Sequence, residues 1–295
     1  MMPINKAVFY AVYVFVATVL QGLASPVAGA MTVFVSIEPQ KYIVQHIGRQ
    51  WVDVRVMVPP GASPHTYEPK PAQMAALADT RLFLSIGVAF EDAWLPRFAA
   101  INPGMRIAAS DQDIKKLPIT GHGNHHDASQ ADPSMHDPHI WLSPPLIKIM
   151  ADNTLEALIA VDPAHADHFK THHASLLREL DTLDRQIREL LADAAGTRFM
   201  VFHPSWGYFA KTYGLIQVPI EVGGKEPKPA QLQHLIREAR AAGIKVIFAQ
   251  PQFSDRSAQV IAQAIDGSVI VADPLAFDLM NNLLRQAEAI MQAAR

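Results

Sequence analysis

Three histidines and one aspartate stand out because a proline is the immediate neighbour of each: His65, His139, His203 and Asp273. Proline restricts the backbone, and a metal site needs ligands whose positions are fixed before the ion arrives. Three neutral imidazoles and one carboxylate form a set of three nitrogens and one oxygen, which suits tetrahedral zinc. The chain has no cysteine, so thiolate ligands and disulfides are excluded, and copper(I) is disfavoured. All-oxygen calcium or magnesium coordination fits this set poorly.

Each of these residues also has a structural explanation that needs no metal. A single histidine is more often a surface or core residue than a ligand. Asp273 before Pro274 is a common helix start, with aspartate at the N-cap and proline at the first helical position. Capping and coordination do not exclude each other, because a carboxylate has two oxygens. Glu68 fits either a surface turn or a supporting position beside the site, and both interpretations stay open.

The histidines between positions 122 and 139 fall into two groups. Four lie in the polar segment 119–137, which we expect to be a loop that samples metal loosely or has no role: His122, His125, His126 and His136. The fifth, His139, follows a proline and precedes a short apolar stretch. Ser143 and Pro144 then resemble the cap and first residue of a helix. We expect His139 alone among the five to be a fixed ligand.

The candidate ligands fall at the ends of predicted strands. Short β-branched runs alternate with helical stretches in residues 31–109 and again from 197, which is typical of βαβ units and parallel sheet. His65 follows the strand predicted at 52–58, His203 that at 197–202 and Asp273 that at 268–272. Open parallel sheets bind ligands at the carboxyl ends of their strands, so these side chains are expected to gather there. A last helix is predicted from Pro274.

Residues 163–196, between the two α/β blocks, are expected to form one long helix. Leucine and isoleucine recur there at three- and four-residue steps, with charged residues on the other faces. Roughly 30 residues of helix span about 45 Å, the length of a two-domain protein. The apolar stripe is too short for three or four clean heptads, which disfavours a coiled-coil dimer. We predict a rigid helical spine that joins two α/β lobes, 31–162 and 197–295.

Residues 1–30 have the features of a signal peptide. Lys6 precedes an apolar run at 7–20, and Ala28-Gly29-Ala30 provides the small residues that signal peptidase requires. The apolar run is short for a transmembrane helix, which needs about 20 residues. The alternative is that residues 1–30 are not cleaved and anchor the protein in the membrane. Cleavage after Ala30 predicts an extracytoplasmic mature protein, expected in a Gram-negative periplasm, and without a cysteine at the junction it is not a bacterial lipoprotein.

Composition limits the remaining function classes. The 295 residues are 49% hydrophobic, enough to bury the cores of two compact domains. A net charge of -3 gives no reason to expect nucleic acid or an acidic membrane surface as a partner.

Five stretches carry a resemblance to a known family: VPPGASPHTYEPKPAQ, DPHIWLSP, FHPSWGYFAKTYG, QPQFSDRSA and ADPLAFD. In order and spacing they resemble the substrate-binding proteins of zinc and manganese ABC uptake transporters, over essentially the whole mature chain. The resemblance implies two α/β lobes joined by a long rigid helix, with the metal between them. It also implies that His65, His139, His203 and Asp273 are the ligands. Water or a nearby carboxylate is the alternative to Asp273.

The same resemblance bears on the choice of metal. The manganese members of the family resemble this chain but carry glutamate where it has His203. An imidazole at this position therefore shifts the expectation toward zinc. The histidine-containing loop is similar to a short, diluted form of the loop of the zinc branch. Some relatives carry glutamate where this chain has Gln250, which leaves open whether that strand end contributes to the site.

The expected function is the capture of zinc and its delivery to the membrane permease of an ABC transporter, by a monomer without enzymatic activity. A manganese or iron carrier of the same fold is the first alternative. A zinc hydrolase is the second. It is disfavoured because no HExxH motif is present and no acid or base is placed one turn from a ligand histidine.

Overall fold

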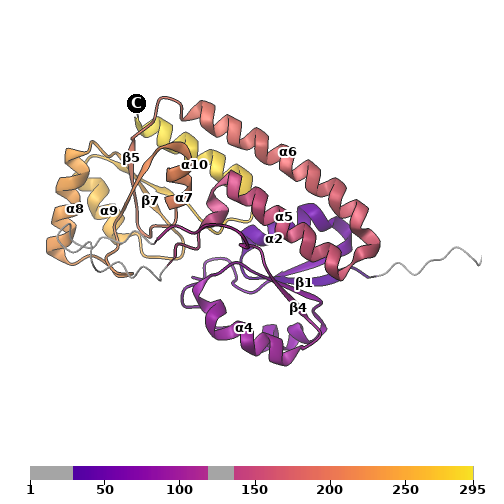
Figure 1. Ribbon diagram of the computed structural model, residues 1–295. Coiled ribbons are helices and arrows are strands. Elements are labelled where there is room, and N and C mark those ends of the chain that lie inside the picture. The colour runs from indigo at the N-terminus through magenta and orange to yellow at the C-terminus, as the bar shows by residue number, and fades with distance from the viewer. Residues whose placement is uncertain (1–28, 119–135, 295) are drawn as a thin grey trace, which may run out of the picture. The chain divides into compact units, whose positions relative to one another are not determined.

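Two four-stranded parallel sheets organise the chain, and both have the same strand order, β2-β1-β3-β4 and β6-β5-β7-β8 (Figure 1). The computed structural model describes residues 29–118 and 136–294. The first sheet consists of β1 (Met31–Val35), β2 (Val52–Val56), β3 (Leu82–Ser85) and β4 (Arg106–Ala109). The second consists of β5 (Arg198–Val201), β6 (Ile216–Pro219), β7 (Val246–Ala249) and β8 (Ser268–Val271). Parallel neighbours require crossover connections, and the helices supply them.

The helices follow the strands in alternation, as the sequence pattern predicts. Those that accompany the first sheet are α2 (Glu38–Gly48), α3 (Pro71–Ala76), α4 (Ala89–Ile101) and α5 (Pro144–Val161). The long helix is α6 (Ala166–Leu190), and the second sheet is accompanied by α7 (Gly207–Tyr213), α8 (Pro229–Ala241), α9 (Arg256–Ala264) and α10 (Leu279–Ala294). Short 3₁₀ turns are η1 (Arg49–Trp51), η2 (Leu77–Asp79), η3 (Ile140–Leu142) and η4 (Pro163–His165). The predicted fold class is therefore confirmed: two parallel sheets flanked by helices, with one long helix.

Helix α6 packs against α5 and α2, which accompany the first sheet, and against α10, which accompanies the second (Figure 1). Its buried stripe includes Leu176, Leu180, Leu183 and Ile187. Buried residues of both sheets belong to one continuous hydrophobic cluster with this stripe. Apolar surface that is buried stabilises the folded chain by about 25 cal/mol per Å². The buried stripe of α6 therefore stabilises its contacts with both halves.

Two helices differ from the sequence prediction in their boundaries. Helix α6 is shorter than residues 163–196 at both ends, because Pro163–His165 form a 3₁₀ turn before it and turns follow Leu190. The last helix begins at Leu279, so the predicted start at Pro274 is wrong. Asp273 instead accepts a hydrogen bond from the Leu275 backbone N–H through Oδ1, at 2.9 Å, and so stabilises a turn rather than a helix. The domain boundaries at 162/163 and 196/197 stay predictions.

Helix α4 was absent from the sequence prediction. Its buried residues are Phe90, Glu91 and Phe98, so its inward stripe is narrow. Pro96 also lies inside it, and proline usually ends or kinks a helix. None of the described helices is both long and apolar enough to cross a membrane.

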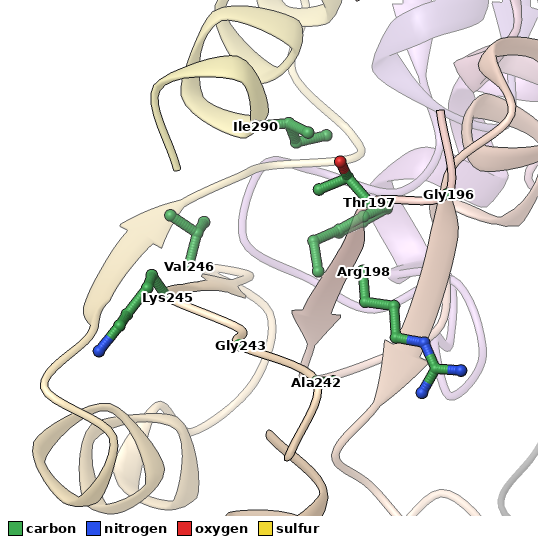
Figure 2. A pocket seen from close by; sticks show the side chains of 9 residues that line it. Gly196, Thr197, Arg198, Ala242, Gly243, Lys245, Val246 and Ile290 are labelled. Carbon is green, nitrogen blue, oxygen red and sulfur yellow. The ribbon is translucent and has the colours of Figure 1, made fainter. Parts of the chain in front are cut away.

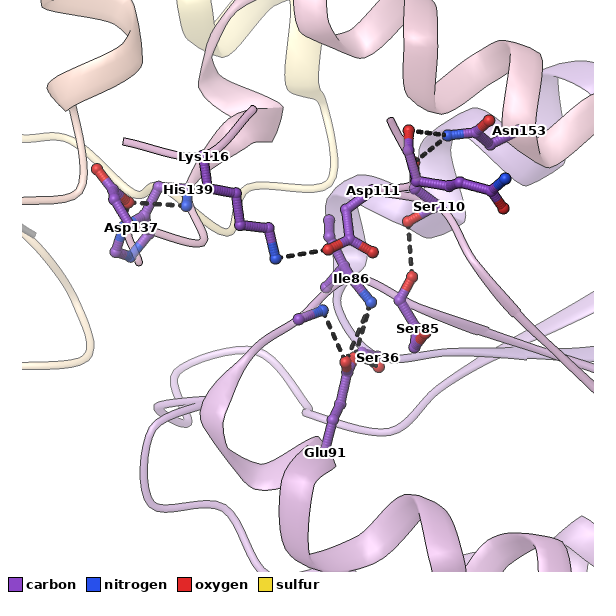
Figure 3. Close-up of polar contacts among 12 residues, drawn as sticks. Ser36, Ser85, Ile86, Glu91, Ser110, Asp111, Lys116, Asp137, His139 and Asn153 are labelled. Carbon is purple, nitrogen blue, oxygen red and sulfur yellow. Dashed lines mark hydrogen bonds and ion pairs between the residues drawn. The ribbon is translucent and has the colours of Figure 1, made fainter. Parts of the chain in front are cut away.

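A buried polar network lies at the carboxyl end of the first sheet (Figure 3). Glu91 accepts hydrogen bonds from the Ser36 hydroxyl, from the Ile86 N–H at 2.9 Å and from the Gly87 N–H at 2.7 Å. Gly87 has φ +81°, which a residue with a Cβ rarely adopts. Burial raises the pKa of Glu91 to about 7, against the opposing effect of these donors. The network ties the ends of β1 and β3 to α4.

Candidate metal centre

Three of the four predicted ligands come together in the structure. His65, His139 and His203 each offer one ring nitrogen, and the three nitrogens lie within 4.8 Å of one another. The Nε2 atoms of His65 and His203 are 3.1 Å apart. A tetrahedral zinc ion with bonds of about 2.0–2.1 Å places two ligand nitrogens about 3.3 Å apart. The observed separation is therefore close to one edge of a zinc tetrahedron.

His65 is carried by the segment between β2 and α3. Gln73 donates from Nε2 to the Met57 carbonyl at 2.6 Å, and it accepts from the Tyr67 hydroxyl at 2.6 Å. These two bonds hold together the two ends of the segment that carries His65. Burial, followed by the neighbouring imidazoles of His203 and His139, lowers the pKa of His65 to about 3, against the opposing effect of Asp137. His65 is consequently neutral at physiological pH, the state that binds metal.

His139 is held by the aspartate two residues before it (Figure 3). Asp137 Oδ1 accepts from the His139 backbone N–H at 2.9 Å and pairs with its Nδ1 at 2.6 Å. Both side chains are buried. Burial lowers the pKa of His139, while the Asp137 carboxylate raises it. A carboxylate on Nδ1 fixes the ring and leaves Nε2 as the metal-binding atom.

His203 follows β5 and is held from two sides. Its Nδ1 lies 2.9 Å from Glu221 Oε1, and Glu221 is buried two residues after β6. Gln250, at the end of β7, accepts from the His203 backbone N–H at 3.0 Å and donates to its carbonyl at 2.6 Å. The imidazole also stacks on Phe253, with ring centroids 5.0 Å apart. Gln250 thus fixes the backbone of His203, and Glu221 fixes its ring.

Trp141 joins the segment that carries His139 to the loop before α10. Its ring lies edge to face with His139, with centroids 5.2 Å apart. Its Nε1 donates to the Pro274 carbonyl at 2.7 Å, and the indole is fully buried. The backbone next to Asp273 is therefore attached to the segment that carries His139.

These contacts determine the histidine tautomers. Glu221 and Asp137 are carboxylates that accept hydrogen bonds, so His203 and His139 carry their proton on Nδ1 when neutral. The Nε2 atom of each then has a lone pair. The short contact between Nε2 of His65 and Nε2 of His203 requires a proton or a cation between the two atoms. In the metal-free protein that proton lies on Nε2 of His65. Among the described residues, no hydrogen bond to Nδ1 of His65 is found.

The other predicted site residues lie outside this group. Asp273 Oδ1 accepts from Gln252 Nε2 at 2.7 Å as well as from the Leu275 N–H, and Asp273 is not among the three clustered residues. Glu68 is exposed. His136 is exposed and forms an antiparallel bridge with Pro118. The remaining loop histidines lie outside the described residues: His122, His125 and His126.

A separate hollow of about 310 Å³ lies at the amino ends of β5 and β7 (Figure 2). Its lining includes Thr197, Arg198 and Lys245, and none of the predicted ligands. Parallel sheets bind ligands at the carboxyl ends of their strands, where His65 and His203 lie beside His139. We therefore place the candidate site at the histidines.

Comparison with known proteins identifies the family. A model of the ZnuA family, described as "Zinc-uptake complex component A periplasmic", matches residues 33–292. The chain belongs to the ZnuA family. This confirms the resemblance drawn from the sequence motifs. The ZnuA family comprises extracytoplasmic solute-binding proteins and is not a family of enzymes.

Individual ZnuA relatives are similar over most of their length. A ZnuA crystal structure has 39% identity and a TM-score of 0.83, covering 90% of this chain and 100% of that one. A ZnuA deletion mutant with zinc bound has 40% identity and a TM-score of 0.82, covering 90% of this chain and 98% of that one. The high-affinity zinc uptake system protein ZnuA of Bacillus subtilis (strain 168) is 26% identical over 261 residues, covering 86% of this chain and 82% of the relative.

Proposed function

We propose that this protein is the zinc-binding component of an ABC uptake transporter, and that it binds Zn²⁺ through His65, His139 and His203. The observation that carries the proposal is the convergence of three imidazole nitrogens within 4.8 Å. Two of these rings are already oriented by buried carboxylates. Such preorganisation lowers the cost of assembling the site when the ion enters.

Zinc is the favoured cargo because the site offers nitrogen ligands. Manganese prefers oxygen donors, whereas zinc accepts imidazole readily in a tetrahedral site. The names of the relatives support the same metal: the Bacillus subtilis protein is a zinc uptake component, and the ZnuA deletion mutant was crystallised with zinc.

Water and Asp273 are the two candidates for the fourth ligand. Asp273 Oδ1 has two hydrogen-bond donors, Gln252 Nε2 and the Leu275 N–H. To reach the ion, Asp273 must leave these donors or use its other carboxylate oxygen. An Asp273→Asn variant separates the two cases: unchanged zinc affinity assigns the fourth position to water, and weakened affinity assigns it to Asp273.

Delivery requires a compartment and a partner. The proposal places the mature protein in the periplasm as a monomer, after removal of a signal peptide at Ala30. The partner is the membrane permease of the transporter. Residues 1–28 lie outside the described part, so the amino terminus of the secreted protein, read by mass spectrometry, is the direct test of the cleavage position.

Calorimetric titration of chelator-stripped protein tests the proposed cargo. We expect one zinc per chain, and weaker binding of manganese in direct competition. Zinc at a thousand times its dissociation constant stabilises the fold by about 4 kcal/mol, which raises the melting temperature. If zinc leaves the melting temperature unchanged, or if manganese displaces zinc, the proposal is wrong.

A further inference from the structure

Residues 68–73 and 226–231 have the same sequence, Glu-Pro-Lys-Pro-Ala-Gln. Each of these hexapeptides follows the edge strand of its sheet, β2 or β6, and continues into the next helix, α3 or α8. Since the two sheets also share one strand order, the hexapeptides occupy equivalent places in the two halves of the chain.

The two hexapeptides also have the same local structure. The residue before each helix has similar backbone angles, φ -77° and ψ 152° at Lys70, and φ -67° and ψ 158° at Lys228. The backbone N–H of Lys70 donates to Gln73 Oε1 at 2.9 Å, and that of Lys228 donates to Gln231 Oε1 at 2.8 Å. The repeat is therefore structural as well as sequential.

Helix initiation explains only part of the shared sequence. Proline at the first helical position and glutamine at the third are good helix starters. Lysine before the helix is not, because that position prefers Ser, Thr, Asp or Asn and a cation opposes the helix dipole. Glu68 has no hydrogen bond or ion pair among the described residues, whereas Glu226 accepts a hydrogen bond from Ser257. Local folding thus leaves both lysines and Glu68 unexplained.

We propose that the two hexapeptides form a paired docking surface for a membrane permease that presents the same complementary surface twice, as two copies of one subunit do. This inference rests on the proposed transport function. A partner with two equivalent surfaces is matched by a ligand protein that repeats its contact residues. Each half offers one exposed carboxylate and one exposed ammonium, at Glu68 and Lys70 or at Glu226 and Lys228. The permease surface offers the opposite charges in each subunit, which sets orientation and specificity.

This surface is directly connected to the metal centre. In the first half, Gln73 of the hexapeptide is bonded to Met57 and Tyr67, at either side of His65 along the chain. In the second half, Glu221 pairs with His203 and lies a few residues before the hexapeptide. Binding of the permease at both hexapeptides therefore engages the two segments that fix His65 and His203.

The test measures stimulation of the transporter ATPase. The permease with its ATPase subunits, from the same organism, is reconstituted in phospholipid nanodiscs and titrated with zinc-loaded protein. The variants are Lys70→Glu, Lys228→Glu and the double variant. Lys170→Glu, at an exposed position on α6, is the matched control. Zinc titration and thermal melting check that each variant is folded and binds zinc.

We expect each single reversal to raise the half-maximal concentration about tenfold, the double variant about a hundredfold, and the control to match the wild type. The inference is overturned if both single variants stimulate like the wild type, or if only one of the two has an effect. A dimer of the zinc-loaded protein alone that the double variant abolishes would assign the surface to self-association and overturn it too. If the wild-type protein binds zinc but never stimulates the ATPase, the transport function itself fails, and the docking inference with it.

Discussion

The Nε2 atoms of His65 and His203 lie 3.1 Å apart, although these residues are separated by 138 positions in the chain. Two lone pairs do not approach so closely without a proton or a cation between them. Since Glu221 holds the proton of His203 on Nδ1, His65 supplies the proton between the two rings in the metal-free protein. In the proposed site, zinc takes the place of that proton.

Zinc binding should therefore change the tautomer of His65 and leave those of His139 and His203 unchanged. In ¹⁵N NMR spectra at neutral pH, we expect Nε2 of His65 to be protonated before zinc is added and metal-bound afterwards. The other two rings should keep a protonated Nδ1 in both states, because Asp137 and Glu221 accept from it. A metal-free protein in which Nδ1 of His203 lacks the proton would contradict this account.

His139→Ala should lower zinc affinity by about 100-fold or more, because it removes a complete ligand from a site with few donors. His168→Ala is the matched control, because His168 is exposed on α6 and lies outside the cluster. Competition with a chromophoric chelator measures both variants. Wild-type affinity in His139→Ala would remove this residue from the site.

Asp137→Asn and Glu221→Gln should each weaken zinc binding by about 10- to 100-fold while the fold is kept. Each substitution replaces a carboxylate that orients one imidazole and makes it a better donor. Asp152→Asn serves as the control, since Asp152 pairs with His173 at 2.7 Å, another carboxylate–histidine pair outside the cluster. If Asp152→Asn weakens zinc binding as much as Asp137→Asn and Glu221→Gln do, the two carboxylates have no specific role at the site.

Acid should destabilise the metal-free protein through His65. Burial lowers the pKa of His65 to about 3 from its ordinary 6.5, so between these values the unfolded chain binds a proton that the folded chain does not. Stability is fully present above pH 6.5 and falls as the pH decreases toward 3. Urea unfolding across this range should show a smaller loss in His65→Gln than in the wild type. Equal losses would show that His65 does not titrate in this way.

Glu91 should change the stability in the opposite direction to His65, over a pH range that overlaps that of His65. Burial raises the pKa of Glu91 to about 7 from 4.5, so the folded chain binds the extra proton between these values. Stability is therefore lost as the pH rises from 4.5 to 7, by about 3 kcal/mol at most. In Glu91→Gln this loss should disappear, which urea unfolding at pH 4.5 and pH 7 measures. A loss of equal size in the variant would assign the effect to other groups.

Much of the fold and part of the site follow from local sequence patterns. Alternating β-branched and helical segments predict the strands well, since those expected at 52–58, 197–202 and 268–272 begin and end within two residues of these positions. The rule that ligands gather at the carboxyl ends of parallel strands places His65 at that end of the first sheet and His203 at that end of the second, and the two side chains meet. That the three histidines are the zinc ligands stays a proposal.

Other features depend on contacts that no local pattern encodes. Asp137 and Glu221 were missed as supporting residues, although an aspartate two positions before a candidate ligand and a glutamate two residues after a strand are available signals. Asp273 was expected to cap a helix, but the chain first forms a turn that packs Phe277 against Tyr42. The narrow buried stripe of α4 and its internal Pro96 concealed a helix that tertiary packing stabilises.

The position of Trp141 gives the protein an intrinsic optical reporter. Its indole is completely shielded from water, contacts the ring of His139 and is anchored to the Pro274 carbonyl. A cation on His139 changes the electric field at a fluorophore that cannot move away. We therefore expect the colour and yield of Trp141 emission to change when the proposed site is filled, so that metal exchange can be timed in unlabelled protein.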